Sequence, residues 1–198
     1  MRPVSERLNV IYIRYFEDFA VGKGTLQTIT GTSQVLNGTL LMNPGNAEHC
    51  DLENDVDFQN IFLIASVTLP LSGSFALRFN IQNSSDFYRM VADMATSTMR
   101  MERVVAGVPT VIDGPHYVDM VSGVQYVLSI STFFDDVSNQ TMIRYLHDSN
   151  VVGQVFDSAY DKGKFGFESQ GAQSTIREIE MFLKPLETNR INPNFQVQ

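Results

Sequence analysis

Four acidic residues stand at every second position of a short segment, and together they could bind a cation. They are Asp51, Glu53, Asp55 and Asp57. On a β-strand alternate side chains point to the same face, so the four carboxylates would all face one way. Like charges this close repel one another, and a calcium ion, which takes oxygen ligands, would relieve the repulsion. Two hypotheses stay open: a calcium site, or a solvated acidic edge that discourages pairing with another strand.

Histidine and cysteine are too scarce for the usual nucleophilic catalysis. The histidines are His49, His116 and His147, and none lies in a recognisable nucleophile motif. Cys50 is the only cysteine, which excludes an intrachain disulfide, and we interpret it as a small, semi-buried thiol. Its neighbours His49 and Asp51 would point in other directions from it on a strand or loop. The sequence also has no glycine-rich phosphate loop and no zinc-ligand spacing.

Short segments in which apolar and polar residues alternate recur along the chain, and they predict the β-strands that carry these residues. Residues 75–81 alternate Phe, Leu, Phe and Ile with Ala, Arg and Asn, and residues 124–130 follow the same period of two. Residues 57–69 are more continuously apolar, as in a strand covered on both sides. Turn signals such as 83–86 and 113–115 separate these segments, and no long helical pattern lies between them. We therefore predict an all-β fold, an antiparallel two-sheet β-sandwich.

Length and charge limit the number of domains and the kinds of partner. A chain of 198 residues with 43% hydrophobic residues can form one domain with a sizeable core. Its formal net charge of -8 disfavours binding to nucleic acid or to anionic membranes. No apolar run approaches the roughly 20 residues of a membrane span, and the first residues mix charged with apolar side chains, unlike a secretory signal. We expect synthesis in the cytoplasm without a signal peptide.

The two ends differ from the rest of the chain. We divide it into an N-terminal arm (1–14), a β-sandwich (15–184) and a C-terminal arm (185–198). The C-terminal arm has no periodicity but carries two apolar residues, Ile191 and Phe195. We predict that these two residues anchor the arm on this domain or on a neighbouring chain.

The order of the predicted strands resembles the concanavalin A-like lectin/glucanase superfamily, which includes laminin G-like domains. The matching segments are YFEDF (15–19), VLNGTL (35–40), GSFALRFN (73–80), DFYRM (86–90), YVLSI (126–130), GKFGF (163–167) and the closing strand 176–182. The resemblance covers roughly residues 15–184 and implies the jelly-roll form of the sandwich. Because fold does not fix function, it leaves the chemistry open.

The superfamily contains glycoside hydrolases, which need two carboxylates flanking the glycosidic bond. The acidic run at 51–57 is similar to their Glu-x-Asp-x-x-Glu strand, but its spacing differs and it precedes the apolar strand. The family also often holds a structural calcium between its first and last strands. Here Asp18 matches the first position, whereas Arg177 stands where an aspartate is usual, so an ion pair between the two would replace the metal. We predict a non-catalytic member.

The resemblance also suggests carbohydrate binding. Such sites commonly stack an aromatic ring on the sugar and surround it with planar polar groups, and this chain has no Trp. The candidate residues are Tyr88 and Tyr145 as stacking platforms, with Arg78, Asn80 and Arg89 as hydrogen-bonding partners; Tyr117 and Tyr160 are further possible platforms. The alternative is ordinary strand packing, because tyrosine and arginine alternate with core residues in these segments.

Two functions from different classes are consistent with these observations. The first is a non-enzymatic structural or attachment protein, a β-sandwich docked through its arms onto other protein subunits of a larger assembly, such as a phage virion surface or tail. The second is a carbohydrate-binding, lectin-like module that recognises a cell-surface or matrix polysaccharide. The sequence places the first ahead of the second and locates the protein on a virion or a cell exterior.

Overall fold

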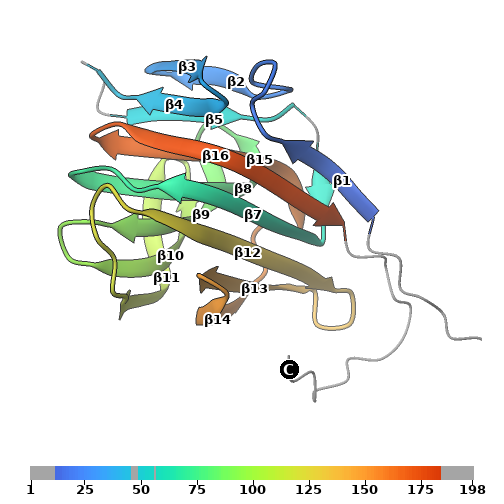
Figure 1. Cartoon of the computed structure of the whole chain (residues 1–198). Coiled ribbons are helices and arrows are strands. Elements are labelled where there is room, and N and C mark those ends of the chain that lie inside the picture. The colour runs from blue at the N-terminus through green and yellow to red at the C-terminus, as the bar shows by residue number, and fades with distance from the viewer. Residues whose placement is uncertain (1–11, 46–48, 56, 184–198) are drawn as a thin grey trace, which may run out of the picture.

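The computed structural model describes residues 12–45, 49–55 and 57–183. The described residues form a sandwich of two antiparallel eight-stranded sheets, as the sequence predicts (Figure 1). No helix among them is long and apolar enough to cross a membrane. The predicted C-terminal arm, with Ile191 and Phe195, lies outside the described residues.

Sheet A forms the front layer in Figure 1. Its strand order is β14 (Asn150–Asp157), β13 (Gln140–His147), β12 (Gln125–Asp135), β7 (Ile61–Thr68), β16 (Ser174–Leu183), β4 (Thr39–Asn43) and β3 (Thr32–Leu36). Strand β1 (Tyr12–Glu17) also pairs with β16. The first strand therefore begins at Tyr12, within the segment that the sequence assigned to the N-terminal arm.

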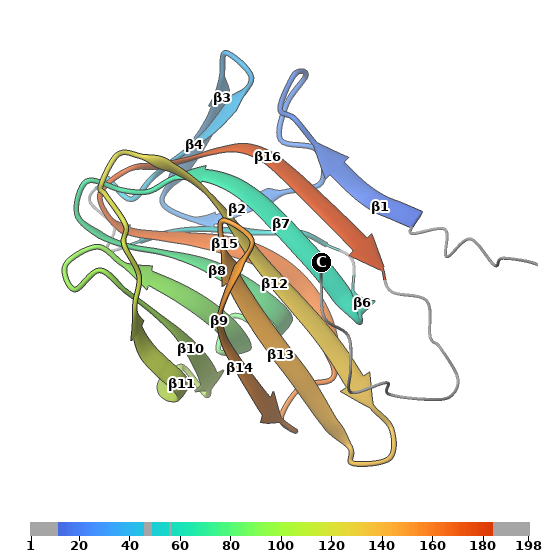
Figure 2. The same ribbon diagram turned by 60° about the horizontal axis from the view of Figure 1, so that its bottom comes forward.

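Sheet B lies behind sheet A in Figure 1. Figure 2 brings the bottom of that view forward, so that both sheets can be seen. Its strand order is β11 (Val108–Tyr117), β10 (Thr98–Val105), β9 (Asp86–Asp93), β8 (Gly73–Asn83), β15 (Lys162–Gly171), β5 (His49–Glu53) and β2 (Gln27–Thr30). The short strand β6 (Phe58–Gln59) also pairs with β15. The edge strands β11 and β14 contact each other, so the two sheets meet along one side.

The core lies between the sheets and follows the period of two. Phe75, Leu77 and Phe79 of β8 point into it and are fully buried, as their alternation predicts. In β7 every second residue is buried, but the residues between them are half-buried. The apolar segment at 57–69 is thus not covered equally on both sides, because its outer residues lie on the outer face of sheet A.

Cys50 is fully buried in this core rather than semi-buried. Its thiol donates a hydrogen bond to the carbonyl oxygen of Thr32 at 3.3 Å. Burial raises the pKa of the thiol above its usual value. The side chain therefore behaves as part of the core rather than as a nucleophile.

Candidate functional site

The outer face of sheet B carries two neighbouring groups of paired charges, which together we call the charged network. Its members come from five neighbouring strands: Asp51 and Glu53 from β5, Glu168 from β15, Arg78 from β8, Arg89 and Asp93 from β9, and Arg100 and Glu102 from β10. They reach this face because they alternate with core residues on each strand. The strand register then brings acids and bases together, for example by pairing Arg89 with Glu102.

Arg89 lies at the centre of the network. Its Nε donates to Oε2 of Glu102 at 2.7 Å, and its Nη1 donates to both carboxylate oxygens of Glu168 at 3.0 and 2.9 Å. Arg100 holds the other side of Glu102, donating from Nε to Oε1 at 2.5 Å, and reaches Asp93 through Nη1 at 3.2 Å. One chain of charge-assisted hydrogen bonds therefore connects three strands of the sheet.

These contacts determine the charge state at the centre. Burial opposes ionisation of Glu102, but hydrogen bonds from Arg100 and Arg89 outweigh burial and lower the pKa of the carboxyl. Burial likewise disfavours the charge on Arg89, but Glu168 and Glu102 outweigh it and raise the pKa of the guanidinium. The central groups are therefore ions at neutral pH and are held in place by one another.

Arg78 occupies the position at which the sequence suggested a calcium ion. Its Nη1 lies 3.4 Å from Oδ1 of Asp51, and its Nη2 lies 3.0 Å from Oε1 of Glu53. Gly166 lies opposite Arg78 on one side and Glu53 on the other, so no side chain at that position separates the charges. The guanidinium also stacks on the ring of Phe87, 4.0 Å from its centroid. This arginine supplies the positive charge between the two acids.

The four predicted calcium ligands do not converge. Strand β5 ends at Glu53, and Asp55 and Asp57 lie exposed beyond it. Asp51 instead accepts a hydrogen bond from Thr30 at 2.7 Å. In the part of the chain that the structure describes, no group of three or more His, Cys, Asp or Glu side chains could hold a metal ion. The calcium hypothesis therefore requires correction, since it assumed one strand through all four acids.

The two predicted stacking tyrosines also require correction. Tyr88 and Tyr145 are fully buried between the sheets. The hydroxyl of Tyr88 donates to Asp157 at 2.5 Å, and that of Tyr145 donates to Asp113 at 2.9 Å. Their rings are core residues and are not available to a sugar.

Of the three predicted polar partners, Arg78 and Arg89 lie on the outer face of sheet B, whereas Asn80 lies at an irregularity of β8 and has a positive φ. Asn80 is buried, and its Nδ2 donates to the carbonyl oxygen of Tyr160 at 3.0 Å. Arg78 is buried in its ion pairs, whereas the side chain of Arg89 is 20% exposed. Of the five predicted residues, only Arg89 is therefore both in the network and partly open to solvent.

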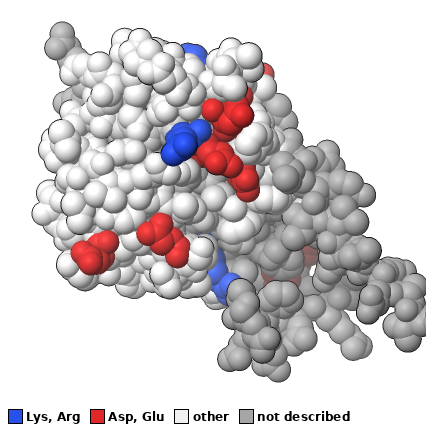
Figure 3. All heavy atoms as spheres, in the orientation of Figure 1, with Lys and Arg blue, Asp and Glu red and all other residues white. Residues whose placement is uncertain are grey.

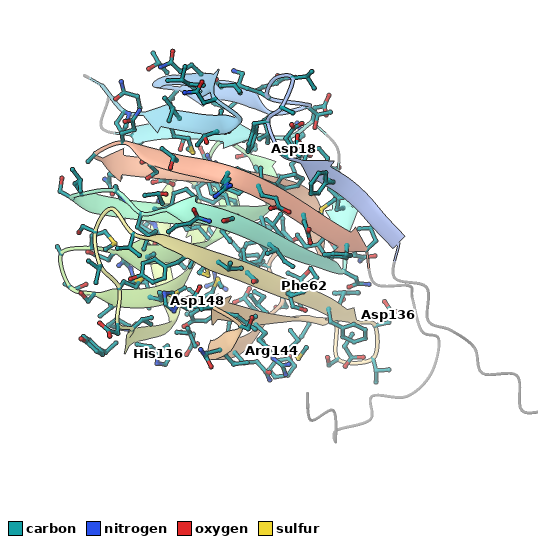
Figure 4. All side chains as sticks on the ribbon, in the orientation of Figure 1. Asp18, Phe62, His116, Asp136, Arg144 and Asp148 are labelled. Atoms are coloured by element: carbon teal, nitrogen blue, oxygen red, sulfur yellow. The ribbon has the colours of Figure 1, made fainter. Side chains whose placement is uncertain are left out.

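The opposite face of the sandwich differs in charge. Figure 3 shows the outer face of sheet A, where uncharged residues separate a basic group with acidic neighbours over β16 from a few further charged groups near the lower edge. Asp18 and Arg177 line a hollow of about 490 Å³ on this face. Figure 4 shows Asp18 just after β1. Among the described residues the structure shows no ion pair between Asp18 and Arg177, so the predicted replacement of a metal by that pair is wrong.

Comparison with known proteins supports the fold. No protein-family model matches the chain, and no curated protein matches it. Among solved structures, the carbohydrate-binding module CBM66 from Bacillus subtilis matches 80% of this chain and 95% of the module, with 14% identity and a TM-score of 0.68. The laminarinase from Flavobacterium sp. UMI-01 matches 86% of this chain and 100% of the enzyme, with 12% identity and a TM-score of 0.62.

A third neighbour is the metal-free carbohydrate recognition domain of Emp46p, which matches 80% of this chain and 87% of that domain, with 11% identity and a TM-score of 0.58. The concanavalin A-like jelly-roll fold predicted from the sequence is therefore confirmed. The neighbours include binding modules as well as enzymes, and at these identities the likeness concerns the fold alone.

Proposed function

We propose that the protein binds a polysaccharide without cleaving it, and that the polysaccharide lies on the outer face of sheet B. The observation that carries this proposal is the charged network, with Arg89 and Arg100 at its partly open centre. Guanidinium and carboxylate groups are planar and form paired hydrogen bonds, which suits neighbouring hydroxyls on a sugar. The neighbours that are carbohydrate-binding modules and recognition domains favour the same function.

The network is suited to binding because its groups are already ordered. Arg89 and Arg100 each use Nε and Nη1 for their contacts within the network. Among the described residues, the structure shows no partner for the Nη2 atom of either arginine. A donor held rigidly by its neighbours loses little conformational entropy when a ligand binds. The side chains of Arg89 and Arg100 are 20% and 23% exposed, so a ligand can reach them from solvent.

The same contacts argue against hydrolysis. A glycosidase requires one carboxylic acid that gives up a proton and a second carboxylate that acts as nucleophile or base. Here the pKa of Glu102 is lowered, which is opposite to the shift that a general acid needs. Glu168, Asp51 and Glu53 each contact an arginine. The carboxylates on this face therefore serve to hold the arginines.

This proposal reverses the order that the sequence suggested. Attachment to a larger assembly came first there, and carbohydrate binding came second. The comparisons with solved structures favour carbohydrate binding, whereas a virion location and docking to protein subunits stay predictions, since they depended on the terminal arms. The two functions are compatible, because a polysaccharide-binding face also attaches a protein to a surface.

The proposal is tested by affinity electrophoresis in gels that contain soluble β-glucan, levan, mannan or κ-carrageenan. We expect at least one polysaccharide to retard the protein without release of reducing ends. Arg89→Lys keeps the charge but loses the planar fork, and it should weaken the retardation at least tenfold. Arg144→Lys is the matched control, because Arg144 lies on sheet A (Figure 4). Equal retardation of the two variants, or release of reducing ends, would contradict the proposal.

A further inference from the structure

We propose that a second binding site, for a single neutral sugar ring, lies at the edge of the sandwich where β11 meets β14. A hollow of about 590 Å³ opens there, within the range of small-ligand sites. It is lined by Pro115, His116, Tyr117, Val118, His147, Asn150, Val151 and Val152. His116 is labelled at this edge in Figure 4. No member of the charged network lines the hollow, so the two sites are separate.

One wall of the hollow offers an aromatic surface. The side chain of Tyr117, at the end of β11, is 77% exposed. Tyrosine is enriched where ligands and partners pack, because its ring is apolar and its hydroxyl is polar. Val151, on the facing strand β14, is also exposed and adds apolar surface. Together these residues provide the apolar contact that the face of a sugar ring requires, and which Tyr88 and Tyr145 cannot provide from the core.

The second wall offers a buried polar atom without a partner. His147 is only 9% exposed, and its Nε2 makes no hydrogen bond within the described part of the chain. Buried polar groups are nearly always hydrogen-bonded, so an unpaired nitrogen beside a hollow indicates a ligand or water. The His147 ring packs on Tyr126 with 4.7 Å between ring centroids, which fixes its orientation. Nε2 itself has less than 1 Å² of exposed surface, so a ligand hydroxyl in the hollow would become its partner when a lining side chain moves aside.

The groups around the hollow favour a neutral ligand. Nε2 of His116 lies 3.3 Å from Oδ2 of Asp113, and the same oxygen accepts the hydrogen bond from Tyr145. An anionic ligand at the hollow would therefore be repelled by the Asp113 carboxylate. The lining residues themselves carry amide, imidazole, phenol and apolar groups. The assignment of a sugar, rather than another neutral polyol, rests on the proposed function.

The site is tested by NMR titration of the whole protein with D-glucose, D-galactose, D-mannose and N-acetyl-D-glucosamine at millimolar concentrations. We expect at least one of these sugars to shift the backbone amide signals of residues 116–118 and 147–152. His147→Phe keeps a planar aromatic ring but removes Nε2, and Tyr117→Ala removes the aromatic wall. Each should weaken binding at least tenfold. Phe156→Ala, an exposed aromatic on the same edge strand outside the hollow, is the control and should bind as the unmodified protein does.

The same titration separates this inference from the proposed function. Shifts at the hollow that both variants abolish support the second site, whether or not the charged network responds. Shifts confined to the charged network on β8, β9 and β10 support the polysaccharide face and overturn the second site. If no sugar shifts the hollow, or if both variants bind as the control does, the inference is wrong.

Discussion

Arg89→Ala tests how strongly the charged network stabilises the sandwich. The change removes three charge-assisted hydrogen bonds and leaves Glu168, which is almost buried, without its cation. Breaking a buried ion pair by removing one partner costs about 3–5 kcal/mol. Because the Arg89 side chain is 20% exposed, we expect the lower end, about 3 kcal/mol. For a chain of this size that corresponds to a fall in melting temperature of about 6–12 °C.

The assay is urea unfolding at neutral pH together with a thermal melt. Arg144→Ala on sheet A is the control, since among the residues that the structure describes Arg144 is hydrogen-bonded only to Gln154, at the surface, and we expect a change within about 0.5 kcal/mol. The double variant Arg89→Ala/Glu168→Gln should recover part of the loss, because the unpaired carboxylate is then neutral. A loss below about 1 kcal/mol for Arg89→Ala is typical of a solvated surface pair, and it would refute a buried network.

Three further predictions concern single features of the fold. Tyr88→Phe should destabilise the protein by about 1–3 kcal/mol in urea unfolding, because the half-buried Asp157 loses a hydrogen bond; no change would mean that the hydroxyl is solvated. Gly166→Ala should lower the melting temperature strongly, because an added Cβ would lie 2.2 Å from the carbonyl oxygen of Leu52; a neutral result would contradict the strand register. Glu102 has a folded-state pKa below its usual 4.5, so its contribution to stability is present above that pH and is lost as the pH falls through the folded-state pKa. Urea unfolding across this acidic range should show a smaller pH dependence for Glu102→Gln than for the unmodified protein, and equal dependence would contradict the assignment.

The fold was predictable because its signal is repeated. Alternation in the segment that became β8 placed Phe75, Leu77 and Phe79 inside and Arg78 outside, and the structure agrees. The prediction that Asn80 faces outward was wrong, because β8 is irregular from that residue on. The spacing of turn signals then excluded helices and implied antiparallel neighbours. Each such segment carries little information, but their agreement along the chain defines the sandwich.

The site was only partly predictable, because its geometry depends on strand register. Tyr88 and Arg89 are adjacent on β9 and therefore face opposite ways, so they cannot share a binding surface. Pairing of Tyr88 with Phe79 on β8 places the tyrosine in the core. Because Phe87 and Tyr88 are adjacent and both apolar, the sequence did not show which of them faces the core. A strict period-two assignment beginning from Arg89 would have identified the correct face.

The remaining members of the network come from distant parts of the chain. Glu102 and Glu168 are separated by 66 positions in the sequence, and both meet Arg89 only after β8, β9, β10 and β15 pair. The same holds for the hollow at β11 and β14, whose histidines come from different sheets. Such contacts follow from topology, so composition and local spacing could not predict them.

The most direct test of the central claim is to locate bound polysaccharide by hydrogen-exchange mass spectrometry. The protein is compared with and without the soluble polysaccharide that retards it most in the affinity gel. We predict slower exchange in β8, β9 and β10 of sheet B, and unchanged exchange in β7, β12 and β13 of sheet A. Protection confined to sheet A, or none on either sheet with the polysaccharide bound, would contradict the account.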